Sequence, residues 1–256
     1  MSFLKFIKVL IGLQKKLDIK ILPSQGLFYQ NDFEVYIRKA KLEHIIEYEH
    51  NYVKDNIGLI IEKLKKIVEK NTILPPNYSF HDMKSIDIIF IFFEIVKLTK
   101  GKSVILEYFD DEKGKEETVE FNSKYFNYFY IDEEFNKFYN KDEKYFLIDG
   151  YKYTLPTIGV ENCLTNFLIS KSFDSDAIKY NNFNYLFTYF LGQRNNISFS
   201  EIENLIQIFN YDMEVEEIKK VKNIVKKISP IQKYSLKKGN KVIDINSKID
   251  LEKIWK

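Results

Sequence analysis

The chain has 256 residues, of which 39 are basic and 37 are acidic, and 45% of all residues are hydrophobic. This length supports one large domain or two small ones, and the nearly balanced charge excludes a global attraction to nucleic acid or to an anionic membrane. The single cysteine, Cys163, excludes an internal disulfide and a thiolate metal cluster.

The first seventeen residues place apolar side chains at three- and four-residue steps, which predicts a short amphipathic helix. We expect residues 1–20 to form an N-terminal extension rather than a signal peptide, because lysines interrupt the apolar run and no small-residue cleavage site follows. The apolar face docks either in a partner's groove or on the chain's own core, and both alternatives stay open. The candidate partner-binding residues of this helix are Phe3, Phe6, Ile7, Leu10, Leu13 and Leu17.

Pro23 and Gly26 end helical structure after this extension. Residues 33–38 then alternate apolar and polar side chains, which predicts a half-buried strand. The loop between the two features contains Phe28 and Tyr29, which either anchor a partner protein or fill the core of the domain. We name both aromatic residues as further candidate partner-binding residues.

The helical spacing of apolar residues over 42–68, with one break, predicts two helices. The very apolar segment 85–98 predicts a central helix, with a start-like signal at Ser79 and Asp82 and an end at Gly101. Its most apolar stretch, residues 86–96, contains two acidic residues and is far shorter than the roughly 20 apolar residues that a membrane-spanning helix needs. We therefore expect no contact with a membrane.

The middle of the chain is predicted to be rich in β-structure. Residues 102–109 and 116–121 flank a charged loop, as the two strands of a β-hairpin do. Asp149 and Gly150 form a tight-turn sequence between the strands of a second hairpin. The segment 125–142 between the hairpins has no clear pattern.

Helical patterns return after Pro156. Ser198 and Glu201 form a capping box, in which each side chain bonds to the other residue's backbone N–H. The sequence ends with a predicted hairpin around residues 237–240 and a short segment at 251–255. The predicted helices of this part cover residues 160–170, 175–191, 198–209 and 214–228.

The whole pattern predicts an α+β fold that is mainly helical, with a central antiparallel β-hairpin unit and a C-terminal β-hairpin. We expect residues 21–256 to form one domain behind the N-terminal extension. Its consecutive parts are a strand with helices at 21–100, a β-rich unit at 101–156, helices at 157–229 and a ribbon at 230–256.

The sequence contains no recognisable catalytic motif. His44 and His50 are six residues apart, which places them about 120° apart around a helix axis and off a shared metal-binding face. Residues 98–103 lack the first glycine of a phosphate-binding loop. The carboxylate clusters lie in polar surroundings that would not raise a pKa for acid–base work. We expect no enzyme, no small-molecule substrate, no cofactor and no metal.

Lysines and aromatic residues alternate over residues 123–141, a composition that can stack nucleobases. Acidic residues within the same run oppose contact with phosphates. A nucleic-acid-binding module is therefore the alternative function rather than the first one, and such binding would weaken steeply with salt.

Four segments carry a resemblance to a known family. Residues 21–38, ILPSQGLFYQNDFEVYIR, combine Leu-Pro-Ser, a glycine, Phe-Tyr and a strand that ends in arginine; residues 85–90, SIDIIF, lead through a Ser/Gly-containing turn to the strand 105–108. Residues 146–157, FLIDGYKYTLPT, pair two strands before Pro-Thr, and residues 234–245 form the terminal hairpin. In this order they resemble the baseplate hub subunit family of T-even-type contractile-tailed bacteriophages, from about Leu22 to the end of the chain.

The chain departs from the family pattern at three places. Residues 93–99 replace a helix end of the form Leu-Arg-x-x-Ser, the terminal ribbon lacks a cysteine pair, and residues 2–20 precede the usual start. The resemblance implies a non-enzymatic tail protein, either a baseplate hub component or a hub assembly factor. It implies hub, tube or tape-measure proteins as partners, and a location in the virion baseplate or in the host cytoplasm during assembly.

Overall fold

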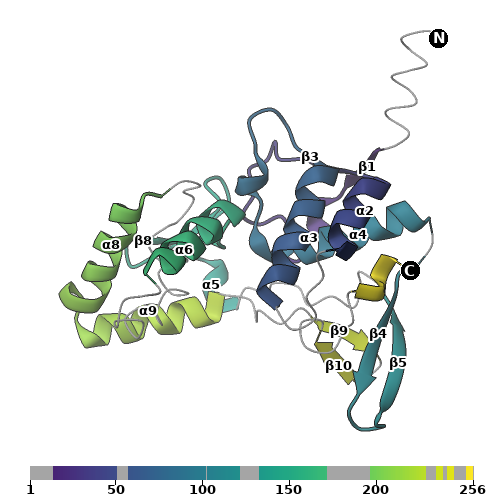
Figure 1. Cartoon of the computed structure of the whole chain (residues 1–256). Coiled ribbons are helices and arrows are strands. Elements are labelled where there is room, and N and C mark those ends of the chain that lie inside the picture. Colours follow the sequence, from purple (N-terminus) through teal and green to yellow (C-terminus); the bar gives the residue numbers. More distant parts are fainter. Residues whose placement is uncertain are drawn as a thin grey trace.

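A computed structural model describes residues 14–50, 57–101, 103–121, 133–171, 197–228, 235–238, 241–244 and 252–255. These residues form an α+β fold in which helices outweigh four small antiparallel sheets (Figure 1). The predicted fold class is confirmed. The predicted helix at 175–191 and residues 1–13 lie outside the described residues.

The first sheet has the order β1–β2–β3, and its strands are β1 (Gln14–Leu17), β2 (Val35–Arg38) and β3 (Thr72–Ile73). In β1 the prediction of a helix through Leu17 is wrong. Leu17 lies opposite Val35 in an antiparallel pair, and its side chain is buried. The pairing satisfies the backbone of β1, so a tertiary contact overrides the helical spacing.

Three helices pack around this sheet, and all three were predicted. They are α2 (Leu42–His50), α3 (Ile57–Asn71) and α4 (Ile88–Lys100). Gly101 ends α4 in a left-handed conformation, with φ of 65°, as a helix C-cap commonly does. The capping signal at Ser79 opens only a short 3₁₀ turn, η2 (Phe80–Asp82), and a second one, η3 (Ser85–Asp87), precedes α4.

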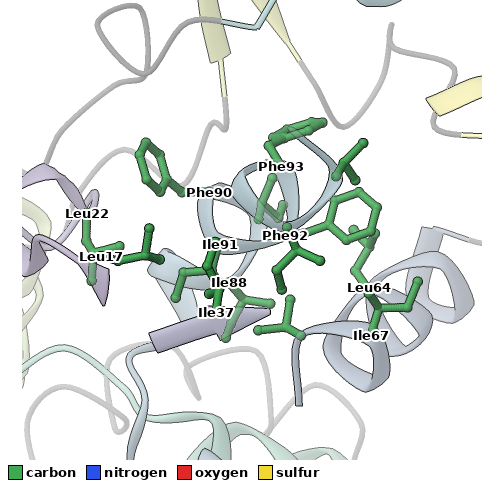
Figure 2. Close-up of a cluster of buried hydrophobic side chains, with 14 of the residues drawn as sticks. Leu17, Leu22, Ile37, Leu64, Ile67, Ile88, Phe90, Ile91, Phe92 and Phe93 are labelled. Carbon is green, nitrogen blue, oxygen red and sulfur yellow. The ribbon is translucent and has the colours of Figure 1, made fainter. Parts of the chain in front are cut away.

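The first hydrophobic core surrounds α4, whose residues from Ile88 to Val96 are all buried. A helix that is apolar around its whole circumference needs partners on every side. Figure 2 shows Ile88 and Ile91 on the side of α4 that faces Ile37 of β2, and Phe92 directed towards α3. Phe93 stacks on Phe121, at a ring-centroid distance of 4.7 Å, just beyond the first hairpin.

The first predicted hairpin is confirmed as β4 (Ile105–Asp110) paired with β5 (Lys115–Glu120). The second is β7 (Tyr145–Ile148) with β8 (Tyr151–Tyr153), and β6 (Tyr139–Asn140) adds a third strand that the sequence pattern did not reveal. Asp149 and Gly150 have φ of 53° and 82°, as their tight turn requires.

The second core lies between this sheet and a set of helices (Figure 1). Phe146 and Phe167 are fully buried in it. Ser198 and Glu201 form the predicted capping box. The helices are α5 (Glu133–Asn136), α6 (Ile158–Lys171), α8 (Phe199–Gln207) with a π-helical end η6 (Ile208–Asp212), and α9 (Val215–Ile228).

The C-terminal hairpin is also confirmed, as β9 (Ser235–Lys238) paired with β10 (Lys241–Asp244). A short turn, η7 (Glu252–Trp255), returns to the first core, where Trp255 meets Phe92 edge to face. We call the parts built around the two cores the first lobe and the second lobe.

Candidate functional site

The loop of residues 22–29 passes between the two cores. Its backbone turns sharply at Gln25 and Gly26, which have φ of 54° and 69°. Leu22 belongs to the first core, while Phe28 belongs to the second. The ring centroid of Phe28 lies 5.8 Å from that of Tyr139 and 5.9 Å from that of Phe146. Neighbouring residues of one loop therefore belong to different lobes.

Asp87, the last residue of η3, is the acceptor at the centre of this region. Its carboxylate accepts hydrogen bonds from the backbone N–H and the hydroxyl of Ser24, each at 2.8 Å. It also accepts one from the Tyr29 hydroxyl at 2.8 Å. Asp87 has no solvent exposure, so these donors replace the water that a buried carboxylate loses.

Lys84 extends the network towards the second lobe. Its backbone N–H donates to the Tyr29 hydroxyl at 2.8 Å, and its buried ammonium donates to the carbonyl of Leu155 at 3.3 Å. Lys84 and Thr157 also pair as an isolated antiparallel bridge. We name Ser24, Tyr29, Lys84 and Asp87 the junction, because they link segments that are more than 50 residues apart in sequence.

Burial shifts the pKa of each ionisable group of the junction. It raises the pKa of the Asp87 carboxyl to about 6, although the hydrogen bonds from Ser24 and Tyr29 oppose this shift. It lowers the pKa of the Lys84 ammonium to about 8, against the opposing charge of Asp87. Burial also raises the pKa of Tyr29 well above its usual value. Within the junction, the contacts of Lys84 with Leu155 and Thr157 are the ones that reach the second lobe.

A second polar contact joins α3 to α6. The ammonium of Lys65, which is largely buried, donates to the side-chain oxygen of Asn162 at 3.2 Å and lies 3.9 Å from Glu161. Burial raises the pKa of Glu161, and a hydrogen bond with the Ser85 side chain opposes that rise. The two lobes are thus connected through the junction and through a contact between helices.

Phe28 and Tyr29 are buried, with 5% and 4% of their surface exposed. Their burial agrees with the alternative that they fill the core, while their role in binding a partner stays a prediction. Tyr29 stacks on Phe33 at 4.1 Å, and its hydroxyl belongs to the junction. Leu17 is buried in the first core, while Phe3, Phe6, Ile7, Leu10 and Leu13 lie outside the described residues.

His44 is a structural residue. Its ring nitrogen Nδ1 lies 3.2 Å from the side-chain oxygen of Asn71, and both residues are buried. Within the described ranges, no three metal-ligating side chains gather closely enough to hold a metal ion. Among the residues that the structure describes, no helix is long and apolar enough to cross a membrane.

Several large apolar side chains are exposed at places that the sequence pattern did not single out. Ile105 and Phe109 lie on the outer side of the β4–β5 hairpin. Tyr211 and Val215 are exposed where α8 leads into α9, and Leu42 at the start of α2 is 72% exposed. One signal in the sequence could have revealed the exposed residues of the hairpin. Over residues 104–109 apolar side chains occupy both faces of the strand, so one face has to place apolar residues outside the core.

No protein-family model matches the chain, and neither a curated protein nor a solved structure matches it.

Proposed function

We propose that this chain is a non-enzymatic protein of contractile phage tails, either a baseplate hub component or a hub assembly factor. It acts by protein–protein recognition, with other tail proteins as partners. It works in the virion baseplate or, during assembly, in the host cytoplasm.

The observation that carries the proposal is the place where the family-like segments meet. Ser24 and Tyr29 belong to the first such segment, and Asp87 belongs to the second. The third segment supplies the backbone at residues 155–157 that Lys84 and Ser85 contact. These contacts bring three of the family-like segments together in one region of the fold, and this arrangement is what supports the proposal.

Recognition by surfaces also agrees with the distribution of apolar residues. Exposed apolar patches on a protein surface mark interaction sites when they are contiguous and large. Phe109 is 50% exposed on the hairpin of the first lobe, and Tyr211 is 65% exposed at the end of α8 in the second lobe. These two exposed side chains lie in different lobes, and both can be changed without disturbing the junction.

The experiment is affinity capture of the tagged full chain from cells infected with the phage that encodes it, followed by mass spectrometry. We expect hub, tube or tape-measure proteins to be captured, and the variants Phe109→Asp and Tyr211→Asp to map which surface holds them. Mass spectrometry of purified particles and of assembly intermediates then separates a baseplate component from an assembly factor. Capture of no tail protein, together with intact tails when the chain is absent, contradicts the proposal.

The alternative of nucleic-acid binding is tested with the same purified protein. Binding to single- or double-stranded DNA that weakens steeply between low and high salt would replace the proposed function, because phosphate contacts release counterions.

A further inference from the structure

The β4–β5 hairpin has two different faces. Leu106, Tyr108 and Val119 point into the first core. Since side chains alternate along a strand, the residues between them form the opposite face. The register places these outer residues in three cross-strand pairs. We call this set the hairpin face: Ile105 with Glu120, Glu107 with Thr118, and Phe109 with Glu116.

The hairpin face is both apolar and acidic. Ile105 is 59% exposed and Phe109 is 50% exposed, and each lies opposite an exposed glutamate. The six residues include three glutamates and no lysine or arginine. A segment that covers this face must therefore bring apolar side chains for Ile105 and Phe109 and positive charge for the surrounding carboxylates.

Residues 1–13 have the complementary composition. They contain Lys5 and Lys8 and no acidic residue, and their apolar residues include Phe3, Phe6 and Ile7. The chain thus carries a basic apolar segment and an acidic apolar face. We propose that the hairpin face of one copy binds residues 1–13 of a second copy.

The arrangement of the first lobe favours a second copy over the same chain. Figure 1 shows β1, which follows directly after residues 1–13, on the opposite side of the first lobe from the outer end of the β4–β5 hairpin. The start of β1 and the outer part of the hairpin face of one copy therefore lie apart, whereas a second copy can place its hairpin face next to residues 1–13 of the first copy. The contact is head to tail, so it generates rings or open chains.

The test uses the full-length protein and sedimentation velocity over a range of concentrations. We expect the unmodified chain to associate with itself, and this association to weaken as salt is added. The double variant Lys5→Glu/Lys8→Glu, and separately Glu116→Lys/Glu120→Lys, should each weaken association about tenfold or more, since like charges then face each other. Glu116 and Glu120 are exposed, so these substitutions do not disturb a core.

Mixing the two double variants gives the decisive result. In the mixture every N-terminal segment finds a hairpin face of opposite charge on the other variant, and association should return to about the level of the unmodified chain. The matched control is Glu69→Lys/Glu214→Lys, which changes the net charge equally at exposed positions outside the hairpin and should not affect association.

A chain that stays monomeric at every concentration overturns the proposal, as does docking of the segment on its own copy. So does a pair of double variants whose mixture does not associate. These outcomes are independent of the proposed tail function, because the readout is the association of the purified chain with itself.

Discussion

The phenol oxygen of Tyr29 lies 2.8 Å from Asp87 Oδ2 and 2.8 Å from the backbone nitrogen of Lys84. One hydroxyl therefore donates to a buried carboxylate and accepts from a buried N–H. Because the three residues are almost completely buried, water cannot replace either partner. The bond between Tyr29 and Asp87 connects the loop at 22–29 to the segment that leads into α4.

Removal of this hydroxyl should destabilise the fold without disturbing the aromatic packing. In Tyr29→Phe the ring still stacks on Phe33, but the N–H of Lys84 loses its acceptor and Asp87 loses a donor. We expect a loss of about 1–3 kcal/mol in the free energy of unfolding, measured in urea. The control is Tyr151→Phe, which removes an exposed hydroxyl that donates to Glu217 at 3.1 Å and should change stability by less than about 0.5 kcal/mol. Equal effects of the two variants would contradict the assigned role of Tyr29.

The junction should also make stability depend on pH. Burial raises the pKa of Asp87 from 3.8 to about 6, so the unfolded chain releases this proton at a lower pH than the folded chain. The contribution of Asp87 to stability therefore falls as pH rises from about 4 to about 6, and it is constant above that range. Since one pKa unit corresponds to about 1.4 kcal/mol, the loss is of the order of 3 kcal/mol.

The measurement compares urea unfolding of the unmodified chain with that of Asp87→Asn at several pH values from 4 to 7. Asparagine does not ionise, so the difference between the two proteins isolates the titration of Asp87. We expect the unmodified chain to lose stability relative to the variant as pH rises. A gain over the same range would mean that the folded state lowers the pKa of Asp87 instead. The lowered pKa of Lys84, about 8, acts only above this range.

Local signals in the sequence predicted most of the elements but not the junction. Ser198 with Glu201, Asp149 with Gly150, and Gly101 each act through neighbours a few residues away, so their structures follow from short stretches of chain. The bond between Ser24 and Asp87 joins residues 63 positions apart, and no local pattern encodes it. The strand at Gln14–Leu17 was missed for the same reason, because its partner is the distant β2.

Phe28 should matter for stability rather than for binding. Its ring packs between Tyr139 and Phe146 in the second core, so Phe28→Ala leaves a cavity and should cost about 3–5 kcal/mol in the free energy of unfolding. Phe109→Ala removes the same ring from an exposed position and should cost less than about 1 kcal/mol. Both are measured by chemical denaturation in dilute solution. A small effect at Phe28 would show that its ring is not an essential part of the core.

Substitution of Gly26 tests whether the turn at residues 25–26 depends on the close packing of this glycine against Ile19. Its φ of 69° disfavours any other residue, and an alanine Cβ there would lie 3.0 Å from two side-chain carbons of Ile19 and 3.3 Å from its carbonyl oxygen. Gly101 has nearly the same φ, 65°, but open space where the Cβ would be. Gly101→Ala should therefore cost about 1 kcal/mol for the backbone alone, and Gly26→Ala should cost about 1–2 kcal/mol more, because Ile19 must move. Thermal and urea unfolding of both variants measures the difference. Equal losses of stability in the two variants would mean that Ile19 moves aside at no cost. In that case the backbone conformation of Gly26, and not its close packing, would determine the turn between the two cores.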